Sequence, residues 1–148
     1  MGFAARRLPA SMSGTQHYQL VLPTDLAQVG EAVEAVVECC RMQSALSSRL
    51  RFRLRTVAAE AIANAMTYGN RNDAGRRVTV DVELADERIV LAVTDEGVGF
   101  DPADVPELAD HECHEATRGR GLFMIRRLAE RVTFNERGNT IWMTLPRL

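Results

Sequence analysis

Residues 77–94 read RVTVDVELADERIVLAVT and contain two strand-like runs around a three-residue polar break. In the first run, valine or leucine at every second position alternates with Thr79, Asp81 and Glu83. A period of two places the apolar side chains on one face of a strand and the polar ones on the other. The second run, 88–94, follows so closely that we expect an antiparallel hairpin with one buried and one solvated face.

Helical and strand-like segments flank this hairpin on both sides. Thr24 is the expected cap of the first helix, and Gly69 is the expected stop of the second. The expected further elements are a strand over 17–22, helices over 24–40, 47–68 and 122–131, and strands over 132–136 and 140–145. Hairpins dominate this order and the helices cluster, which predicts an α+β fold: a two-layer sandwich of a mainly antiparallel sheet with helices packed on one face.

Length and composition limit the possible function classes. The 148 residues suit a single domain, which we place at 16–148 behind a disordered head of residues 1–15. With 18 basic residues, all arginine, and 20 acidic ones, the net charge is −2, and direct nucleic-acid binding is not expected. No apolar run approaches the roughly 18–20 residues of a membrane span. Three cysteines, two of them adjacent, suit a reducing compartment, so we expect a cytoplasmic protein.

The second predicted helix carries Glu60 and Asn64 four residues apart. At about 100° per residue they lie side by side along the border of an apolar stripe, with alanines around them. A carboxylate and an amide in this arrangement can hold a hard cation through oxygen and leave a carboxylate to accept a proton. A solvated Glu-Asn pair on a helix flank is the alternative.

Two glycine motifs follow. Asp95-Glu96-Gly97-Val98-Gly99 comes directly after a strand; its glycines let backbone contact a flat ligand, and Asp95 can accept from an exocyclic amine. A simple glycine turn is the alternative reading of this motif. Arg118-Gly119-Arg120-Gly121 opens the third predicted helix, where free N–H groups form an anion site. No strand precedes it, and the chain has no lysine, so neither a Rossmann fingerprint nor a Walker loop is present.

Taken together, these segments resemble the GHKL ATPase/kinase superfamily with its Bergerat ATP-binding fold. The matching strings are EAIANAMTYGN (60–70), DEGVGFDPADVP (95–106), GRGLFMIRRLAERV (119–132) and NERGNTIWM (135–143). More narrowly, they resemble the bacterial anti-sigma factor serine/threonine kinases. The resemblance covers about residues 16–146.

The resemblance implies a role for each matching position. Glu60 is implied to be the general base that activates the attacking hydroxyl, and Asn64 to be a magnesium ligand. Asp95 is implied to bind the adenine amino group, supported through water by Thr140. The remaining implied contacts are Gly97 and Gly99 with adenine and sugar, Gly119, Gly121 and the amides of Leu122 and Phe123 with the phosphates, and Arg118 or Arg120 with the γ-phosphate.

The resemblance also implies an ATP- and Mg²⁺-dependent serine/threonine kinase of a partner-switching system. Such a kinase phosphorylates a STAS-domain anti-sigma antagonist and alternately binds a sigma factor or another regulatory target. Its relatives dimerise through the first strand and helix, so we expect a homodimer. Two alternatives stay open: a non-catalytic ATP-binding regulatory adaptor, and a GHKL kinase whose target is not a sigma factor.

Two further features need an interpretation of their own, and the first departs from the family pattern. Tyr68 precedes Gly69 where relatives often carry histidine, and because it falls on the apolar stripe we interpret it as a packing residue. The cluster His111-Glu112-Cys113-His114 contains zinc-ligand types but no accompanying Cys-x-x-Cys, which favours an ordinary polar loop.

Overall fold

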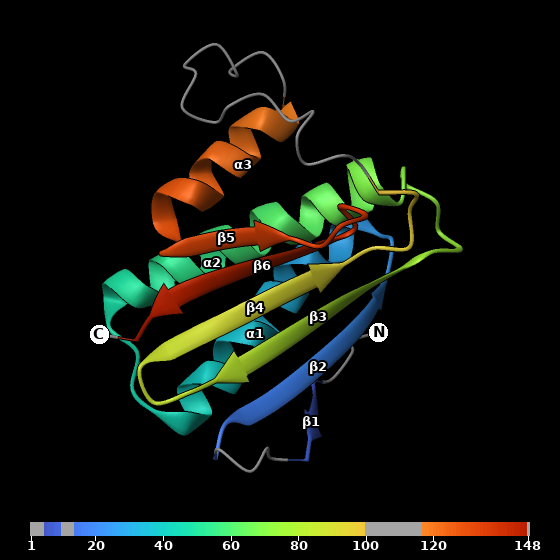
Figure 1. Ribbon diagram of the computed structural model, residues 1–148. Helices are drawn as coiled ribbons and strands as arrows, with labels where there is room; N and C mark the ends of the chain where they lie inside the picture. Colours follow the sequence, from blue (N-terminus) through green and yellow to red (C-terminus); the bar gives the residue numbers. More distant parts are fainter. Residues whose placement is uncertain (1–4, 10–13, 100–116, 148) are drawn as a thin grey trace.

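The computed structural model describes residues 5–9, 14–99 and 117–147, and residues 117–120 through their backbone only. The described residues form a six-stranded sheet in the order β1-β2-β3-β4-β6-β5, with every neighbouring pair antiparallel. Figure 1 shows the helices packed on one face of this sheet, which confirms the predicted α+β two-layer sandwich. The elements are β1 Arg6–Leu8, β2 Gln16–Pro23, the 3₁₀ turn η1 Leu26–Gln28, α1 Val29–Gln43, α2 Ser48–Asn64, the π-helical turn η2 Ala65–Gly69, β3 Arg77–Leu84, β4 Arg88–Thr94, α3 Thr117–Leu128, β5 Arg131–Phe134 and β6 Thr140–Pro146.

Strands β3 and β4 form the predicted hairpin at the predicted residues. Val80 lies opposite Val93, and Val82 lies opposite Leu91. Val80 and Val82 point toward the helices and have no exposed surface. Each such side chain contributes roughly 1.5–3 kcal/mol of burial free energy, so the apolar alternation fixes the register of the hairpin.

The helical layer completes the core. Leu54, Val57 and Ile62 lie on the buried side of α2 and have no exposed surface, while α3 packs beside α2. Cys39 and Cys40 are buried on α1, and burial raises the pKa of the Cys40 thiol to about 12. This thiol therefore stays protonated at neutral pH, in keeping with a packing role.

Two expectations near the N-terminus are wrong. Arg6–Leu8, which we placed in a disordered head, form strand β1 and pair with β2. Thr24 does not cap the first helix; Asp25 caps the 3₁₀ turn η1 that leads into α1, and its Oδ1 accepts from the amide of Ala27 at 3.1 Å. Thr24 is buried and its hydroxyl donates to the carbonyl of Arg76 at 2.7 Å, because a buried hydroxyl needs a partner inside the fold.

The C-terminal end of α2 continues as the π-helical turn η2. The amide of Asn70 donates to the carbonyl of Ala65, five residues earlier, at 2.7 Å. Helical structure ends at Gly69, as predicted, but the left-handed residues that reverse the chain are Arg71 and Asn72, with φ of 53° and 58°. The glycine is needed there for a close contact and not for its φ, because its Cβ position is occupied by another residue.

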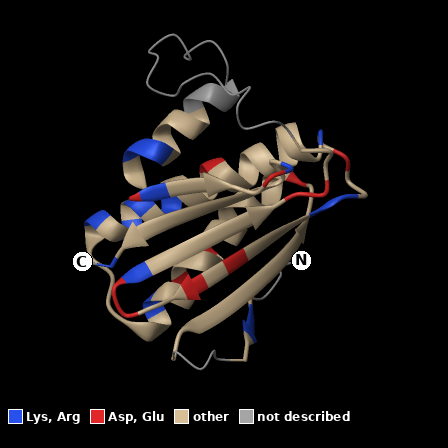
Figure 2. Cartoon of the chain, in the orientation of Figure 1, with Lys and Arg blue, Asp and Glu red and all other residues tan. Residues whose placement is uncertain are grey.

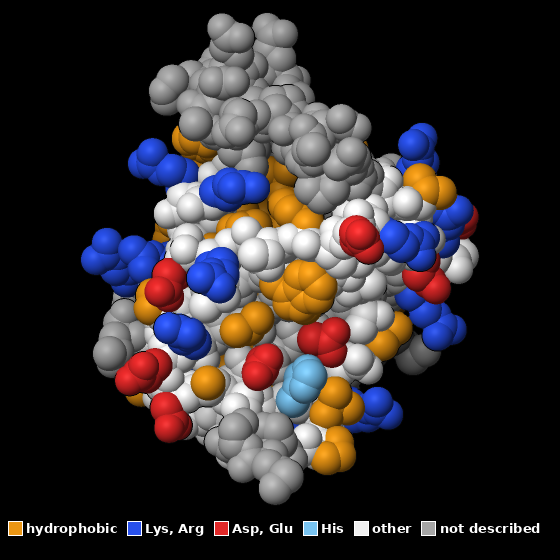
Figure 3. All heavy atoms as spheres, in the orientation of Figure 1, with side chains coloured by type: hydrophobic (Ala, Val, Ile, Leu, Met, Phe, Trp, Pro, Cys, Tyr) orange, Lys and Arg blue, Asp and Glu red, His pale blue; other side chains and the backbone are white. Residues whose placement is uncertain are grey.

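The opposite face of the sheet is not covered by any helix of the described residues. Trp142 on β6 and Val21 on β2 are exposed on this face at 38% and 43%. Figure 3 shows this face, with a large hydrophobic side chain near its centre and charged side chains around it, and Figure 2 shows acidic residues along β3. Among the described helices, none has the length and apolar character that a bilayer crossing requires.

Candidate nucleotide-binding site

Glu60 and Asn64 lie one turn apart on the side of α2 that faces α3. The backbone of Gly121, on α3, approaches both side chains. A Cβ atom at this position would lie 2.8 Å from Glu60 Oε2 and 3.0 Å from Asn64 Nδ2. Glycine therefore allows the two helices to bring the first and third sequence motifs together.

The amide group of Asn64 is incompletely paired within the part of the chain that the structure describes. Its Nδ2 atom is buried and has no hydrogen-bond partner among the described residues. A buried donor without a partner costs about 1–3 kcal/mol unless a ligand satisfies it. Together with the neighbouring Glu60 carboxylate, the amide offers oxygen ligands of the kind that Mg²⁺ takes and a donor for a ligand oxygen, so these residues fit a cation bound with an anionic group.

Asp95 follows β4 at the opposite end of the site and is held on several sides. Its side chain is 9% exposed, and its Oδ1 accepts from the amide of Gly97 at 2.8 Å. The Asp95 amide donates to the carbonyl of Asn139 at 2.9 Å, and Asn139 Nδ2 donates back to the carbonyl of Asp95 at 3.1 Å. These bonds fix the carboxylate before any ligand arrives.

Close backbone approaches surround this carboxylate. A Cβ atom at Gly69 would lie 2.2 Å from Asp95 Oδ2, and a Cβ atom at Gly97 would lie 1.9 Å from the carbonyl oxygen of Gly69. Gly99 has φ of +81°, and a Cβ atom there would lie 1.9 Å from the carbonyl oxygen of Arg137. Side chains are therefore excluded at all three positions by backbone or by Asp95 itself.

One pocket connects the two ends of the site. It is lined by Ala61, Asn64, Ala65, Gly69, Val93, Asp95, Leu122, Ile125, Phe134, Gly138, Asn139, Thr140 and Ile141. Thr140 is buried at its edge, and its hydroxyl is hydrogen-bonded to that of Thr94 at 2.9 Å. Apolar walls with a few convergent polar groups suit a flat, partly apolar ligand that carries hydrogen-bonding atoms.

The predicted beginning of the third helix is wrong. We expected it at Leu122, after the glycines, but α3 begins at Thr117 and includes Gly119 and Gly121. The free amides at a helix start are those of about its first four residues, so here they belong to 117–120. The phosphate contacts implied for the amides of Leu122 and Phe123 remain predictions, and they require the first turn of α3 to rearrange.

Other predicted residues are placed in part or not at all. The side chains of Arg118 and Arg120 lie outside the described residues, as does the whole cluster His111-Glu112-Cys113-His114. Leu122 lines the pocket, whereas the ring of Phe123 lies 5.7 Å below the guanidinium carbon of Arg127. Within the described ranges, no three metal-ligating side chains form a cluster. Tyr68 is half-buried in η2, which fits a packing role without testing it.

Sequence analysis missed three residues that shape the site. Asn139 lies between the two last predicted strands and was assigned no role, yet it forms two hydrogen bonds with the backbone of Asp95. Gly69 was read as a helix stop, although its contact with Asp95 is what requires glycine. Asn70 is fully buried behind the Asp95 loop and was assigned no role. The only signal for Asn70 in the sequence was its position as the last residue of 60–70, one of the strings that resemble the GHKL family.

The assembled site agrees with a comparison against known families. The chain matches the histidine kinase-like ATPase domain over residues 22–145, nearly its whole length. It belongs to this family. Membership implies ATP binding, in accordance with a pocket that joins Asn64 to Asp95.

Two curated relatives of this ATPase domain are named Anti-sigma F factor. That of Shouchella clausii is 37% identical over 51 residues, which cover 34% of this chain and 35% of the relative. That of Oceanobacillus iheyensis is 27% identical over 96 residues, which cover 62% of this chain and 66% of the relative. The chain thus matches about a third of one relative and just under two thirds of the other.

Proposed function

We propose that this protein is an ATP- and Mg²⁺-dependent serine/threonine protein kinase that acts as an anti-sigma factor in a bacterial partner-switching system. Its substrate is a Ser or Thr of a STAS-domain antagonist, and its second partner is a sigma factor or another regulatory target. We further propose that it works in the cytoplasm as a homodimer. The names of the two relatives support the partner class.

The observation that carries the proposal is the close approach of Gly121 on α3 to the side chains of Glu60 and Asn64 on α2. It places a carboxylate beside an amide whose Nδ2 atom has no partner in the described ranges, at the end of the pocket away from Asp95. We call the Asp95 side of the pocket the base-reading end and the Glu60–Asn64 side the phosphate end, after their proposed roles. A protein that only binds nucleotide needs the base-reading end, but it does not need a carboxylate at the phosphate end. The arrangement therefore favours phosphoryl transfer over a non-catalytic adaptor.

In the proposed reaction, the hydroxyl oxygen of the substrate attacks the γ-phosphorus of ATP. Glu60 accepts the hydroxyl proton, and the bond from the γ-phosphorus to the bridging oxygen breaks to release ADP. Asn64 would hold Mg²⁺ through its side-chain oxygen, and the ion would supply positive charge to offset that of the phosphates. Asp95 accepts a hydrogen bond from the adenine amino group and thereby orients the nucleotide.

The test is a transfer assay with γ-labelled ATP, Mg²⁺ and purified STAS-domain antagonists from the same genome. The proposal expects label on an antagonist with the wild-type protein and none with Glu60→Gln, although that variant still binds ATP. The exposed Glu34→Gln, on α1, is the matched carboxylate control and should transfer label normally. ATP binding without transfer to any antagonist would instead support the adaptor.

A further inference from the structure

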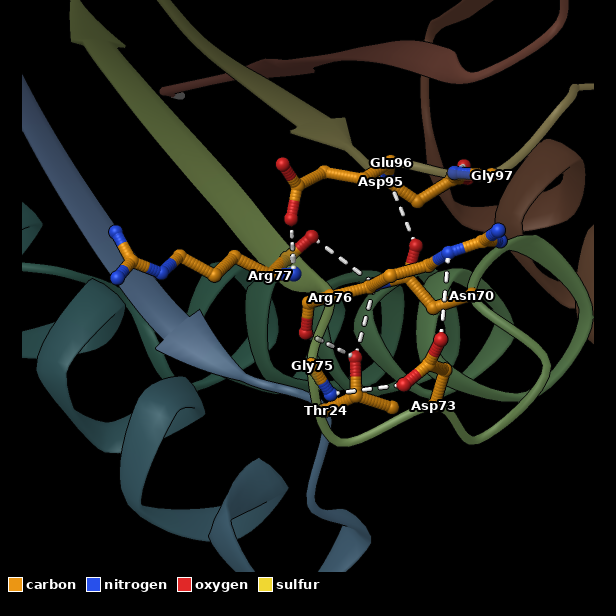
Figure 4. A network of polar contacts seen from close by, with 9 residues as sticks. All are labelled: Thr24, Asn70, Asp73, Gly75, Arg76, Arg77, Asp95, Glu96 and Gly97. Atoms are coloured by element: carbon orange, nitrogen blue, oxygen red, sulfur yellow. Dashed lines mark hydrogen bonds and ion pairs between the residues drawn. The ribbon is translucent and has the colours of Figure 1, made fainter.

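Asn70 follows η2 and has no exposed surface. Its side chain connects this part of the chain to three others. Its Nδ2 atom donates to the hydroxyl of Thr24 at 2.9 Å and to the carbonyl of Arg77 at 3.0 Å. Its Oδ1 atom accepts from the amide of Glu96 at 2.8 Å. Figure 4 shows Asn70 between Thr24, at the end of β2, and the loop that carries Asp95 and Glu96.

Glu96 is the residue between Asp95 and Gly97, and it is held at two points. Its amide donates to Asn70, and its Oε1 accepts from the amide of Arg77. The neighbouring Gly97 amide donates to Asp95 Oδ1 at 2.8 Å. The position of the Asp95 carboxylate thus depends on a loop whose central amide is anchored by Asn70.

Only an amide side chain satisfies these three partners. Glu96 presents a donor, Arg77 presents a carbonyl acceptor, and the Thr24 hydroxyl already donates to Arg76 and so needs a donor from Asn70. An aspartate would place a carboxylate oxygen against the Arg77 carbonyl, and a shorter side chain would not reach Glu96. The surroundings therefore specify asparagine for both its oxygen and its nitrogen.

We propose that Asn70 is a positioning residue that gives Asp95 its selectivity for adenine, acting through the amide of Glu96. This inference rests on the proposed binding of ATP at this site. It assigns to Asn70 a function beyond stabilising the fold, because the bond that it makes with Glu96 lies one residue from the base-reading carboxylate. Thr24, on the other side of Asn70, hydrogen-bonds to Asn70 and to the carbonyl of Arg76, and we assign it a structural role.

The experiment compares Asn70→Ser with Thr24→Val by calorimetric titration with ATP and with ITP, whose base has an oxo group in place of the adenine amino group. Both variants lose buried hydrogen bonds, so both should unfold at lower temperature. Only Asn70→Ser loses the bond to Glu96. We expect it to lower the preference for ATP over ITP about tenfold, while Thr24→Val keeps the wild-type preference.

The possible outcomes separate the inference from the proposed function. An unchanged ATP preference in Asn70→Ser overturns the inference, as does an equal loss in both variants, since a general loss of packing then explains it. Wild-type protein that binds no ATP would overturn the proposed function itself. A wild-type protein that binds ATP and ITP equally well would overturn the adenine contact of Asp95.

A measurement on the wild-type protein covers the case in which Asn70→Ser does not fold. Hydrogen exchange at the Glu96 amide, followed by NMR without nucleotide, reports directly on its bond to Asn70. We expect protection comparable to that of the β4 amides. Exchange at the rate of an exposed loop amide would overturn the proposal, because the loop would then not be anchored.

Discussion

The two ends of the candidate pocket are built in different ways. At the base-reading end, the Asp95 loop is anchored by Asn70, Asn139 and the amide of Gly97. At the phosphate end, a buried nitrogen of Asn64 has no partner among the described residues. The described residues thus hold in advance the carboxylate proposed to select the base, and leave a polar atom for a ligand to satisfy at the end proposed to bind the phosphates.

This difference has a thermodynamic consequence. Groups already held by the protein lose little freedom when a ligand binds, so we expect the proposed base-reading end to contribute selectivity at low entropic cost. The Asn64 nitrogen, which has no partner among the residues that the structure describes, would gain a hydrogen bond in the complex. Substitutions at the base-reading end should therefore change affinity, while those at the phosphate end should change catalysis.

The largest expected effect belongs to the phosphate end. Glu60→Gln removes the proposed base but keeps the size of the side chain, and we expect transfer to the antagonist to fall by about 10²–10⁴-fold with ATP affinity nearly unchanged. Single-turnover transfer and calorimetry measure the two quantities. A parallel loss of both would show that Glu60 binds ATP and would remove the contrast between the two ends.

The next effect is at the base-reading end. Asp95→Asn exchanges a charged acceptor for an amide, and we expect ATP affinity to fall roughly tenfold to a hundredfold. Affinity for ITP should change much less. Equal losses for the two nucleotides in a folded variant would refute the adenine contact.

The two motif glycines offer a paired test of stability. Gly97→Ala places a Cβ atom 1.9 Å from the carbonyl oxygen of Gly69, a backbone atom that can move only with its chain. We expect a loss of about 1–3 kcal/mol in the free energy of unfolding, measured in urea. Wild-type stability in this variant would mean that the Asp95 loop is looser than the structure shows.

Gly121→Ala is the milder member of the pair. Its Cβ atom meets the ends of the Glu60 and Asn64 side chains, which can rotate away, and alanine favours a helix by roughly 0.5–1 kcal/mol. We expect stability to be kept and transfer to fall about tenfold, as the two groups are displaced. Unchanged transfer would show that the Glu60 and Asn64 positions are not critical.

The smallest effect lies away from both ends, at the Glu34–Arg55 ion pair between α1 and α2. The hydrogen bond from Arg55 lowers the pKa of the Glu34 carboxyl. The stability that the ion pair contributes is therefore fully present above the unfolded pKa of glutamate, about 4.3. It is lost as the pH falls through the lower pKa of Glu34 in the folded protein. Because the pair is exposed, it contributes at most about 1 kcal/mol.

Denaturation curves of wild type and Glu34→Gln between pH 3 and pH 7 test this pair. The two proteins should differ near neutral pH and converge at the acidic end, with equal ATP affinity at pH 7. A change in ATP affinity would mean that the ion pair is coupled to the pocket, and would contradict the expectation that this surface pair acts on stability alone.

Patterns with a short period were readable from the sequence. The alternation of residues 77–84 gave β3 its bounds, because each side chain depends only on which face it occupies. The cap near the N-terminus was predicted wrongly because Thr24 and Asp25 are both good capping residues. The Thr24 hydroxyl instead donates to the carbonyl of Arg76, 52 residues away in the sequence, and Asp25 makes the cap bond. The early beginning of α3 was missed because glycine is unfavourable inside a helix, so the helix was expected to begin after Gly119 and Gly121.

The residues of the candidate site also fall into a group that could be predicted from the sequence and a group that could not. Glu60, Asn64 and Asp95 belong to strings that resemble a known family, and the structure brings them to one pocket or its border. Asn70 was not predictable as part of that site, because its partners Thr24 and Glu96 lie 46 and 26 residues away. A buried asparagine shows its importance only once the fold has placed those partners around it.

The most direct test of the account is an NMR titration of ¹⁵N-labelled protein with Mg²⁺ and a non-hydrolysable ATP analogue. The amides of Gly97, Gly121 and Thr140 report separately on three of the segments around the site: the Asp95 loop, α3 and β6. We predict that all three resonances shift along one binding curve with a single Kd. Shifts confined to one segment, or none at saturating nucleotide, would contradict the claim that these segments form one nucleotide site.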